Sequence, residues 1–166
     1  DGTVITLLVP AGRGPEPARD PVPSGPRMRS TREGPTRAPT YPNLLEDAHD
    51  EMLFERYTRS QIAELGAGRS PRLLGKPGMY ESISLSPDSR HILATRIERP
   101  FSFIVSYGSF PHSTVIVDRD GDEVSTLSTS ALREGRSGGF GGDAGVDSAR
   151  AFAWRPDGAG LGYLER

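Results

Sequence analysis

The 166-residue sequence contains no cysteine, few aromatic residues and no long apolar run. The absence of cysteine excludes disulfides, thiolate chemistry and cysteine-type zinc sites, but it leaves the redox compartment open. The longest apolar run, Val4 to Val9, is too short to span a bilayer, and no basic segment precedes it as in a signal peptide. We therefore expect a soluble chain of undetermined compartment.

Neither charge sign predominates, because 20 Lys and Arg stand against 22 Asp and Glu, for a net charge of −2. This balance gives no electrostatic reason to expect nucleic acid or a membrane as a partner. With 34% hydrophobic and 25% charged residues, the composition is that of an ordinary folded domain. The chain begins at Asp1 and ends at Arg166 after a strand-like run, so we expect both ends to be cuts within a longer protein.

A nucleophile elbow is also missing. Serine hydrolases with an α/β fold carry Gly-x-Ser-x-Gly between a strand and a helix. The string occurs here at Gly135 to Gly139, but in a glycine-rich segment that no helical pattern follows, so it does not predict an elbow. The three histidines, His49, His91 and His112, fall on an expected helix, strand and loop, which favours ordinary packing or surface roles. No His, Asp or Glu spacing resembles a metal set. We expect no catalytic residue, no metal site and no cofactor in this chain.

Two further motifs are better explained by turns and loops. Asp118 to Asp122 has acidic spacing but lacks the remainder of a calcium loop, so we predict a hairpin turn. Gly138 to Gly142 lacks the Lys-Ser/Thr pair that binds phosphate and metal, and no helical pattern follows. We expect a flexible loop over Arg133 to Gly145.

The first part of the chain predicts a strand, a long insertion and a helix. Thr3 to Val9 is rich in β-branched residues and is followed by proline, as in a buried strand. Pro10 to Pro42 holds nine of the 15 prolines and has no apolar periodicity, which indicates a surface insertion. The apolar spacing after Asn43 predicts a short amphipathic helix, with Asn43 and Glu46 forming a start like a capping box.

After Arg59 the sequence changes to short strands separated by turn signals, which predicts an all-β meander. Glycine supplies the positive φ that hairpin turns need at Gly66 to Gly68 and at Asp120-Gly121. The expected strands are Ser60 to Leu65, Pro71 to Leu74, Tyr80 to Leu85, His91 to Glu98, Thr114 to Asp118, Glu123 to Leu127, Arg150 to Trp154 and Leu161 to Glu165.

Two hairpin designs recur. ISLSPDSRHILATR from Ile83 and AFAWRPDGAGLGYLER from Ala151 each place x-Pro-Asp-x between apolar strands, and the hairpins from Gln61 and from Val115 repeat a strand, a Gly turn and a strand. Their order suits the four-stranded blades of a β-propeller. We therefore expect an all-β, partial propeller of two to three blades with a Pro/Gly/Arg-rich insertion and one helix. The expected parts are the later strands of one blade over 1–74 with the insertion 10–59, a complete blade over 79–128, and the start of a third over 149–166.

Longer strings carry a family resemblance. Thr40 to Leu65 (TYPNLLEDAHDEMLFERYTRSQIAEL), Leu74 to Asp88 (LGKPGMYESISLSPD) and Thr95 to Gly121 (TRIERPFSFIVSYGSFPHSTVIVDRDG) resemble the propeller of the glutamyl endopeptidase branch of the prolyl oligopeptidase clan. The final Ala153 to Asp157 is similar to the same family in the same order. The resemblance covers nearly the whole chain.

This resemblance implies that the parent protein is a serine peptidase that cleaves peptides after acidic residues. Its partners would be peptide substrates and an α/β-hydrolase domain downstream in the same polypeptide, which would carry the Ser/Asp/His triad. This portion would be non-catalytic and would gate substrate access. The alternative is a stand-alone propeller that binds a protein partner without enzyme activity. Only the first interpretation requires a nucleophile elbow downstream of Arg166.

The aromatic-rich segment Arg99 to Tyr107 lies between the second and third strands of the expected complete blade. Its simpler interpretation is packing against neighbouring blades, because aromatic side chains usually contribute by burial. Alternatively, it projects toward the hydrolase domain, with an arginine available to a substrate carboxylate through bidentate contacts. The candidates for substrate gating or domain contact are Arg96, Arg99, Phe101, Phe103 and Tyr107.

Overall fold

The computed structural model describes residues 2–19, 44–134 and 150–165. Within these residues there are nine strands, one α-helix and one short 3₁₀ helix. In chain order they are β1 (Val4–Leu8), α1 (Ala48–Thr58), β2 (Ser60–Leu65), β3 (Arg72–Gly78), β4 (Tyr80–Leu85), β5 (His91–Ile97), η1 (Tyr107–Ser109), β6 (His112–Asp118), β7 (Glu123–Ser130), β8 (Arg150–Trp154) and β9 (Leu161–Leu164).

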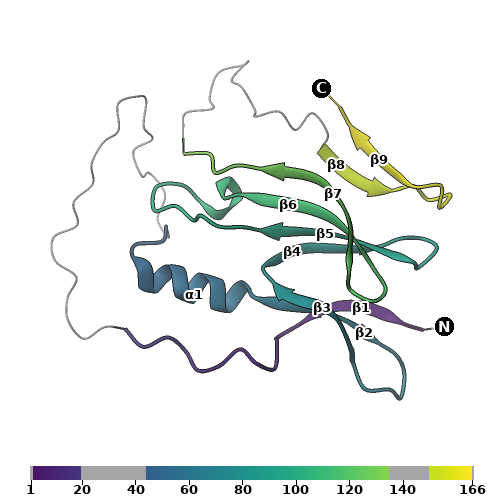
Figure 1. The fold of residues 1–166 in the computed structure, drawn as a ribbon, viewed down its shortest axis with the longest axis horizontal. Helices are drawn as coiled ribbons and strands as arrows, with labels where there is room; N and C mark the ends of the chain where they lie inside the picture. The colour runs from purple at the N-terminus through teal and green to yellow at the C-terminus, as the bar shows by residue number, and fades with distance from the viewer. Residues whose placement is uncertain (1, 20–43, 135–149, 166) are drawn as a thin grey trace.

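The strands form three antiparallel sheets that follow one another along the chain (Figure 1). The first sheet has the order β1-β2-β3, the second β4-β5-β6-β7, and the third β8-β9. Each strand pairs with its sequence neighbour, so the first two sheets are meanders and the third is a hairpin. The expected mostly-β class with one helix is confirmed, whereas a propeller goes beyond what these three sheets establish.

Several element boundaries differ from those expected. β3 continues through Pro77 to Gly78, which is possible because β3 is an edge strand and its proline need not donate to a further strand. β6 begins at His112, so this histidine lies in a strand and not in a loop. β7 extends to Ser130. The glycine-rich segment at 138–142 lies outside the described residues.

The helix begins later than the sequence indicated. Its N-cap is Asp47, whose Oδ1 accepts a hydrogen bond from the Asp50 N–H at 3.0 Å, while Asp50 Oδ2 accepts from the Glu46 N–H at 2.8 Å. This reciprocal arrangement resembles a capping box four residues beyond the expected one. Leu45 precedes the helix and packs against a buried aromatic cluster instead. Asn43 lies outside the described residues.

The repeated Pro-Asp turns have matching geometry. Asp88 Oδ1 accepts from the Arg90 N–H at 3.1 Å, and Asp157 Oδ1 accepts from the Ala159 N–H at 3.0 Å. The residue after each aspartate has a positive φ, 59° at Ser89 and 72° at Gly158. The first turn joins β4 to β5 and the second joins β8 to β9, so the sequence repeat corresponds to a structural repeat in two successive sheets.

The main core lies between the first and second sheets. Ile62 and Leu74 from the first sheet join Ile92 and Val115 from the second, and each is at most 1% exposed. Alternation along β6, with Ser113, Val115 and Val117 buried, places one face of that strand toward the interior. Burial of apolar surface therefore holds the two sheets together.

Besides the apolar core, ion pairs from the β6–β7 turn connect the second sheet to the first. Arg119 pairs with Glu64 at 2.5 Å, and Asp120 pairs with Arg72 at 2.8 Å. Asp118 Oδ1 accepts from the backbone N–H groups of Asp120 and Asp122, both at 2.9 Å, as expected of a hairpin turn. These bonds lower the pKa of Asp118 below its ordinary value.

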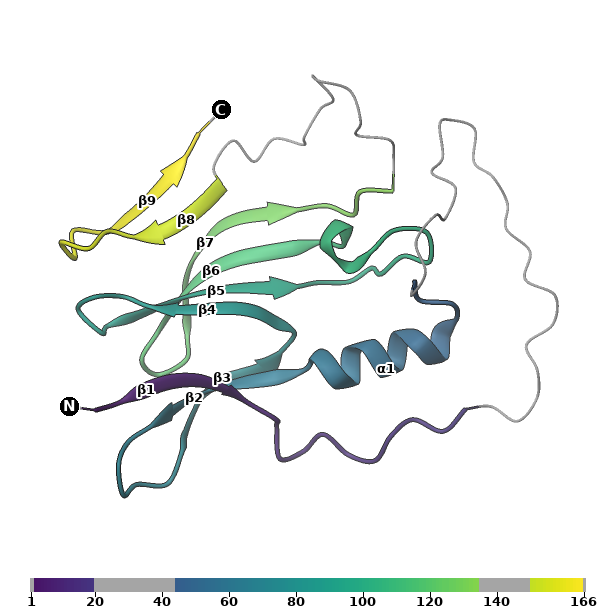
Figure 2. The same cartoon turned by 180° about the vertical axis from the view of Figure 1, so that it is seen from behind.

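In the part of the chain that the structure describes, one side-chain hydrogen bond joins the third sheet to the second. Trp154 Nε1 on β8 donates to the carbonyl oxygen of Ser84 on β4 at 2.9 Å. Figure 2 shows β8 and β9 beside the second sheet, on the side away from the first. Among residues 2–19, 44–134 and 150–165, no helix is long and apolar enough to cross a membrane.

Candidate functional site

The candidate site is built around the connection between β5 and β6, which meets α1 beside the end of the second sheet (Figure 1). A buried cluster of Ile97, Phe101, Val105 and Phe110 forms its interior. Phe54 of α1 packs edge-on against Phe101 and Phe110, with ring centroids 5.1 and 5.6 Å apart. The aromatic-rich connection therefore serves as the docking surface for the helix.

Arg99 reinforces this contact from the outside. Its Nη2 lies 2.7 Å from Glu55 Oε2, and its Nη1 lies 3.4 Å from Glu51 Oε2. The guanidinium also lies 4.6 Å from the centroid of the Phe101 ring. The hydrogen bond to Glu55 raises the pKa of Arg99 above its ordinary value. Both carboxylates belong to α1, so the ion pairs of Arg99 attach the helix to the β5–β6 connection.

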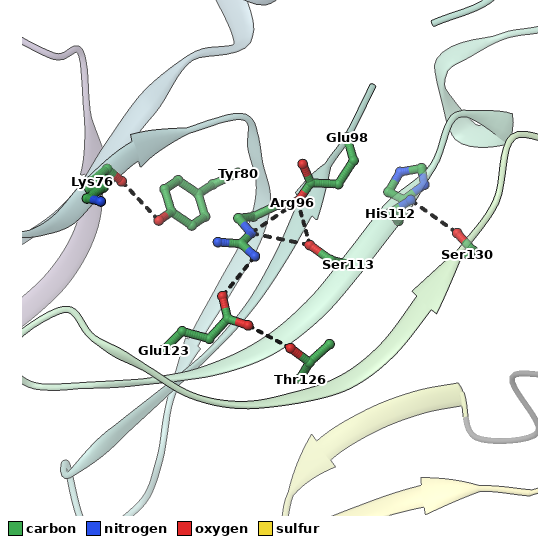
Figure 3. A network of polar contacts seen from close by, with 9 residues as sticks. All are labelled: Lys76, Tyr80, Arg96, Glu98, His112, Ser113, Glu123, Thr126 and Ser130. Atoms are coloured by element: carbon green, nitrogen blue, oxygen red, sulfur yellow. Dashed lines mark hydrogen bonds and ion pairs between the residues drawn. The ribbon is translucent and has the colours of Figure 1, made fainter. Parts of the chain in front are cut away.

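Arg96 lies in a separate polar network on the second sheet (Figure 3). Its Nε donates to Ser113 Oγ at 3.2 Å and lies 3.4 Å from Glu98 Oε1. Its Nη2 lies 3.0 Å from Glu123 Oε2. Ser113 Oγ in turn donates to Glu98 Oε1 at 2.7 Å. Arg96 thus has two carboxylate partners, Glu98 and Glu123.

The network shifts the ionisation of two neighbouring groups. A hydrogen bond from the Thr126 hydroxyl, and then the charge of Arg96, hold the pKa of Glu123 below its ordinary value of 4.5. Burial raises the pKa of Tyr80. The Tyr80 hydroxyl donates to the carbonyl oxygen of Lys76 at 3.2 Å, and its ring packs beside Gly78. Glu123 is therefore a stable anionic partner for Arg96 at neutral pH.

A hollow of about 300 Å³ lies between the end of α1, the β3–β4 junction and the end of β5. It has both charged and apolar lining. Its lining residues are Glu55, Arg59, Pro77, Gly78, Met79, Arg96, Ile97 and Glu98. Only Arg96 among the five residues singled out from the sequence contributes to this hollow.

The five candidates from the sequence do not form one cluster. Phe101 is 6% exposed and belongs to the interior. Phe103 and Tyr107 are 37% and 54% exposed, so their side chains lie on the surface of the connection. Arg96 faces the second-sheet network, whereas Arg99 faces α1. Phe101 packs against Phe54 of α1, a contact that neither interpretation of this segment anticipated.

Sequence reasoning missed the acidic partners of both arginines. Glu51 and Glu55 are four residues apart on α1 and so lie on one helical face, a spacing from which a shared basic partner could have been predicted. Glu98 is close to Arg96 in the chain, but Glu123 comes from β7 and is brought near only by the fold. The sequence placed Phe54 in the expected helix, but nothing in it indicated that this side chain would pack against Phe101 and Phe110.

One group of possible metal-ligand atoms occurs in the described part of the chain, at the start of α1. Atoms of Asp47, His49 and Asp50 lie within 4.8 Å of one another. Asp47 and Asp50 make the helix cap described above, and Arg19 lies 3.3 Å from Asp47. His49 Nε2 bonds to the carbonyl oxygen of Pro17 at 3.1 Å. These contacts account for the cluster as a helix cap and its attachment to the preceding segment.

Comparison with known proteins gives two curated relatives. The chain is 30% identical over 169 residues to a protein named "Probable glutamyl endopeptidase, chloroplastic" from Oryza sativa subsp. japonica, covering 95% of the chain and 17% of that relative. It is 32% identical over 135 residues to a protein of the same name from Arabidopsis thaliana, covering 81% and 14%.

No family model and no solved structure matches the chain. The chain spans less than a fifth of the length of the curated relatives it matches, so the similarity concerns one part of those proteins. The name they share is that of a peptidase. The chain is therefore related in sequence to part of proteins named glutamyl endopeptidase.

Proposed function

We propose that these residues form part of the β-propeller of a serine peptidase similar to glutamyl endopeptidase, and that they gate substrate access without taking part in the chemistry. The observation that carries this proposal is the Pro-Asp turn repeated in two successive antiparallel sheets of a chain related to proteins with that name. Repeated meanders are the units from which propellers are built.

The order of the strands supports the same proposal. The four-stranded second sheet has the strand number of one propeller blade. The three-stranded first sheet and the two-stranded third sheet then correspond to the end of one blade and the start of another. Their unpaired edges would pair with other strands of the same polypeptide, since an exposed sheet edge is otherwise an aggregation hazard.

Phe103 and Tyr107 are the residues through which this portion would contact a hydrolase domain. Both are exposed on the connection between β5 and β6, whose interior is fixed by Phe101 and Phe110. A rigid support with aromatic side chains on its surface suits a contact between domains. Replacing both residues with serine should weaken the association of the separately produced hydrolase domain, whereas replacing Tyr163 on the third sheet should not.

A substrate-recognition role for the two arginines requires a competition with internal carboxylates. Arg96 would have to exchange Glu98 or Glu123, and Arg99 would have to exchange Glu51 or Glu55, for an acidic substrate side chain. Replacing both arginines with alanine in the whole protein should lower kcat/KM for cleavage after glutamate more than after other residues. Unchanged selectivity would remove the arginines from substrate recognition.

The test of the whole proposal is the parent reading frame. Further propeller strands, then Gly-x-Ser-x-Gly with later Asp and His residues, support the peptidase assignment. A propeller that ends without such an elbow would instead support a stand-alone module that binds another protein. Loss of peptidase activity on replacing the elbow serine with alanine would then complete the assignment.

A further inference from the structure

Four charged side chains line the hollow beside α1, and two of them with opposite charge, Arg59 and Glu98, have atoms left over for a ligand. Arg59, at the C-cap of the helix, is half-exposed, and the Glu98 side chain is 45% exposed. Among the described residues no ion pair joins them. Each has partners of its own, but both retain atoms without a partner in that part of the chain.

Arg59 uses little of its hydrogen-bonding capacity. Its one ion pair with a described residue is Nη1 to Glu55 Oε1 at 3.5 Å, a long contact with a carboxylate that also binds Arg99 at 2.7 Å. The remaining guanidinium N–H groups of Arg59 have no partner among the described residues. A guanidinium is suited to a carboxylate because two parallel N–H groups match its two oxygens.

Glu98 offers the complementary charge. Its Oε1 accepts from Ser113 Oγ at 2.7 Å and lies 3.4 Å from Arg96, which fixes the carboxylate in place. Its Oε2 has no partner within the described residues. A carboxylate held by one oxygen, with the other oxygen free, is a ready acceptor for an ammonium group.

Apolar side chains also line the hollow. Pro77, Met79 and Ile97 contribute to the lining, and Ile97 also belongs to the buried aromatic cluster. The volume of about 300 Å³ corresponds to roughly ten waters at about 30 Å³ each. This is enough room for one amino acid with its side chain, but not for a folded peptide.

We propose that this hollow binds a free α-amino acid with an apolar side chain. The ligand carboxylate pairs with Arg59, its ammonium group pairs with Glu98, and its side chain packs against Pro77 and Met79. This inference does not rest on the proposed function, because it concerns binding and no cleavage step. Ion pairs at exposed sites contribute little each, so the expected Kd is on the order of 1 mM.

The probe is L-leucine, measured by isothermal titration calorimetry or ligand-observed NMR with the whole protein. Leucinamide lacks the carboxylate, N-acetylleucine lacks the ammonium group and glycine lacks the apolar side chain. Each should bind at least fivefold more weakly than leucine. Equal binding of leucine and both blocked forms would overturn the proposal, because the two charges would then have no role.

Two variants connect the binding to the named residues. Arg59→Gln and Glu98→Gln should each weaken leucine binding about tenfold while keeping side-chain size. Arg72→Gln is the matched control, because Arg72 pairs with Glu64 and Asp120 and does not line the hollow. Thermal unfolding of each variant checks that it is folded. Leucine binding that is unchanged in folded Arg59→Gln, or absent from the unmodified protein, would refute the proposal.

Discussion

The backbones of Gly75 and Gly121 lie directly against each other, joining an edge strand of the first sheet to the β6–β7 turn of the second. A Cβ on Gly121 would overlap the backbone nitrogen of Gly75, and a Cβ on Gly75 would lie 2.5 Å from the Gly121 carbonyl oxygen. Both residues also have positive φ values, 58° and 91°. Two independent constraints, space and backbone conformation, therefore require glycine at these positions.

Gly121→Ala should lower the free energy of unfolding by ~1–3 kcal/mol or more, because overpacking is added to the cost of the left-handed conformation. Urea unfolding followed by tryptophan fluorescence or circular dichroism measures this change. Gly108→Ala is the control, because nothing lies within 4 Å of a Cβ at that position. Equal stability of the two variants would show that the sheets do not meet through these glycines.

Phe54→Ala should detach α1 from the aromatic cluster. The side chain is partly buried, so the expected loss of stability is about 2–3 kcal/mol, below the range for a fully buried phenylalanine. The helical signal in circular dichroism should fall together with stability, because an 11-residue helix is marginal without tertiary packing. Met52→Ala, on the same helix but 45% exposed, should change either quantity much less.

Acid should destabilise the fold partly through Glu123. Its pKa is lower in the folded protein than its ordinary value of 4.5, so its stabilising effect is present above that value and is lost as pH falls through the folded pKa. Glu123→Gln should therefore reduce the decline in urea midpoint between pH 6 and pH 3. Glu165→Gln, near the exposed end of β9, serves as the comparison. An acid dependence of Glu123→Gln equal to that of the unmodified protein would remove the role of this carboxylate.

The two Pro-Asp turns predict opposite effects of exchanging their fourth residues. Ser89 adopts a left-handed conformation with φ 59°, whereas Gly158 occupies the equivalent position at φ 72°. Ser89→Gly should stabilise by about 0.5 kcal/mol, the strain relieved less the added entropy of the unfolded chain. Gly158→Ser should destabilise by about 1 kcal/mol. Thermal unfolding measures both changes, and a loss of stability in Ser89→Gly would contradict this account.

The sequence alone was sufficient for most of the local structure. Alternating apolar residues and turn glycines predicted the strands, and β2 and β4 have the bounds expected for them. The Pro-Asp repeat correctly indicated two hairpins of the same design, because its hydrogen bonds are local and depend on residues two positions apart. The helix was expected, but its start was not, since Leu45 packs into the aromatic cluster before the helix begins.

Only the tertiary structure decided what the charged residues do. Arg99 is close in space to Glu51 and Glu55 because α1 packs against the β5–β6 connection. Arg96 reaches Glu123 because β7 pairs with β6 in the same sheet. Long-range ion pairs of this kind leave no periodic signal in the chain. Local patterns determined the strands, turns and helix. The packing of distant segments determined that Arg96 and Arg99 are paired with carboxylates, whereas Arg59 keeps guanidinium N–H groups without a partner among the described residues.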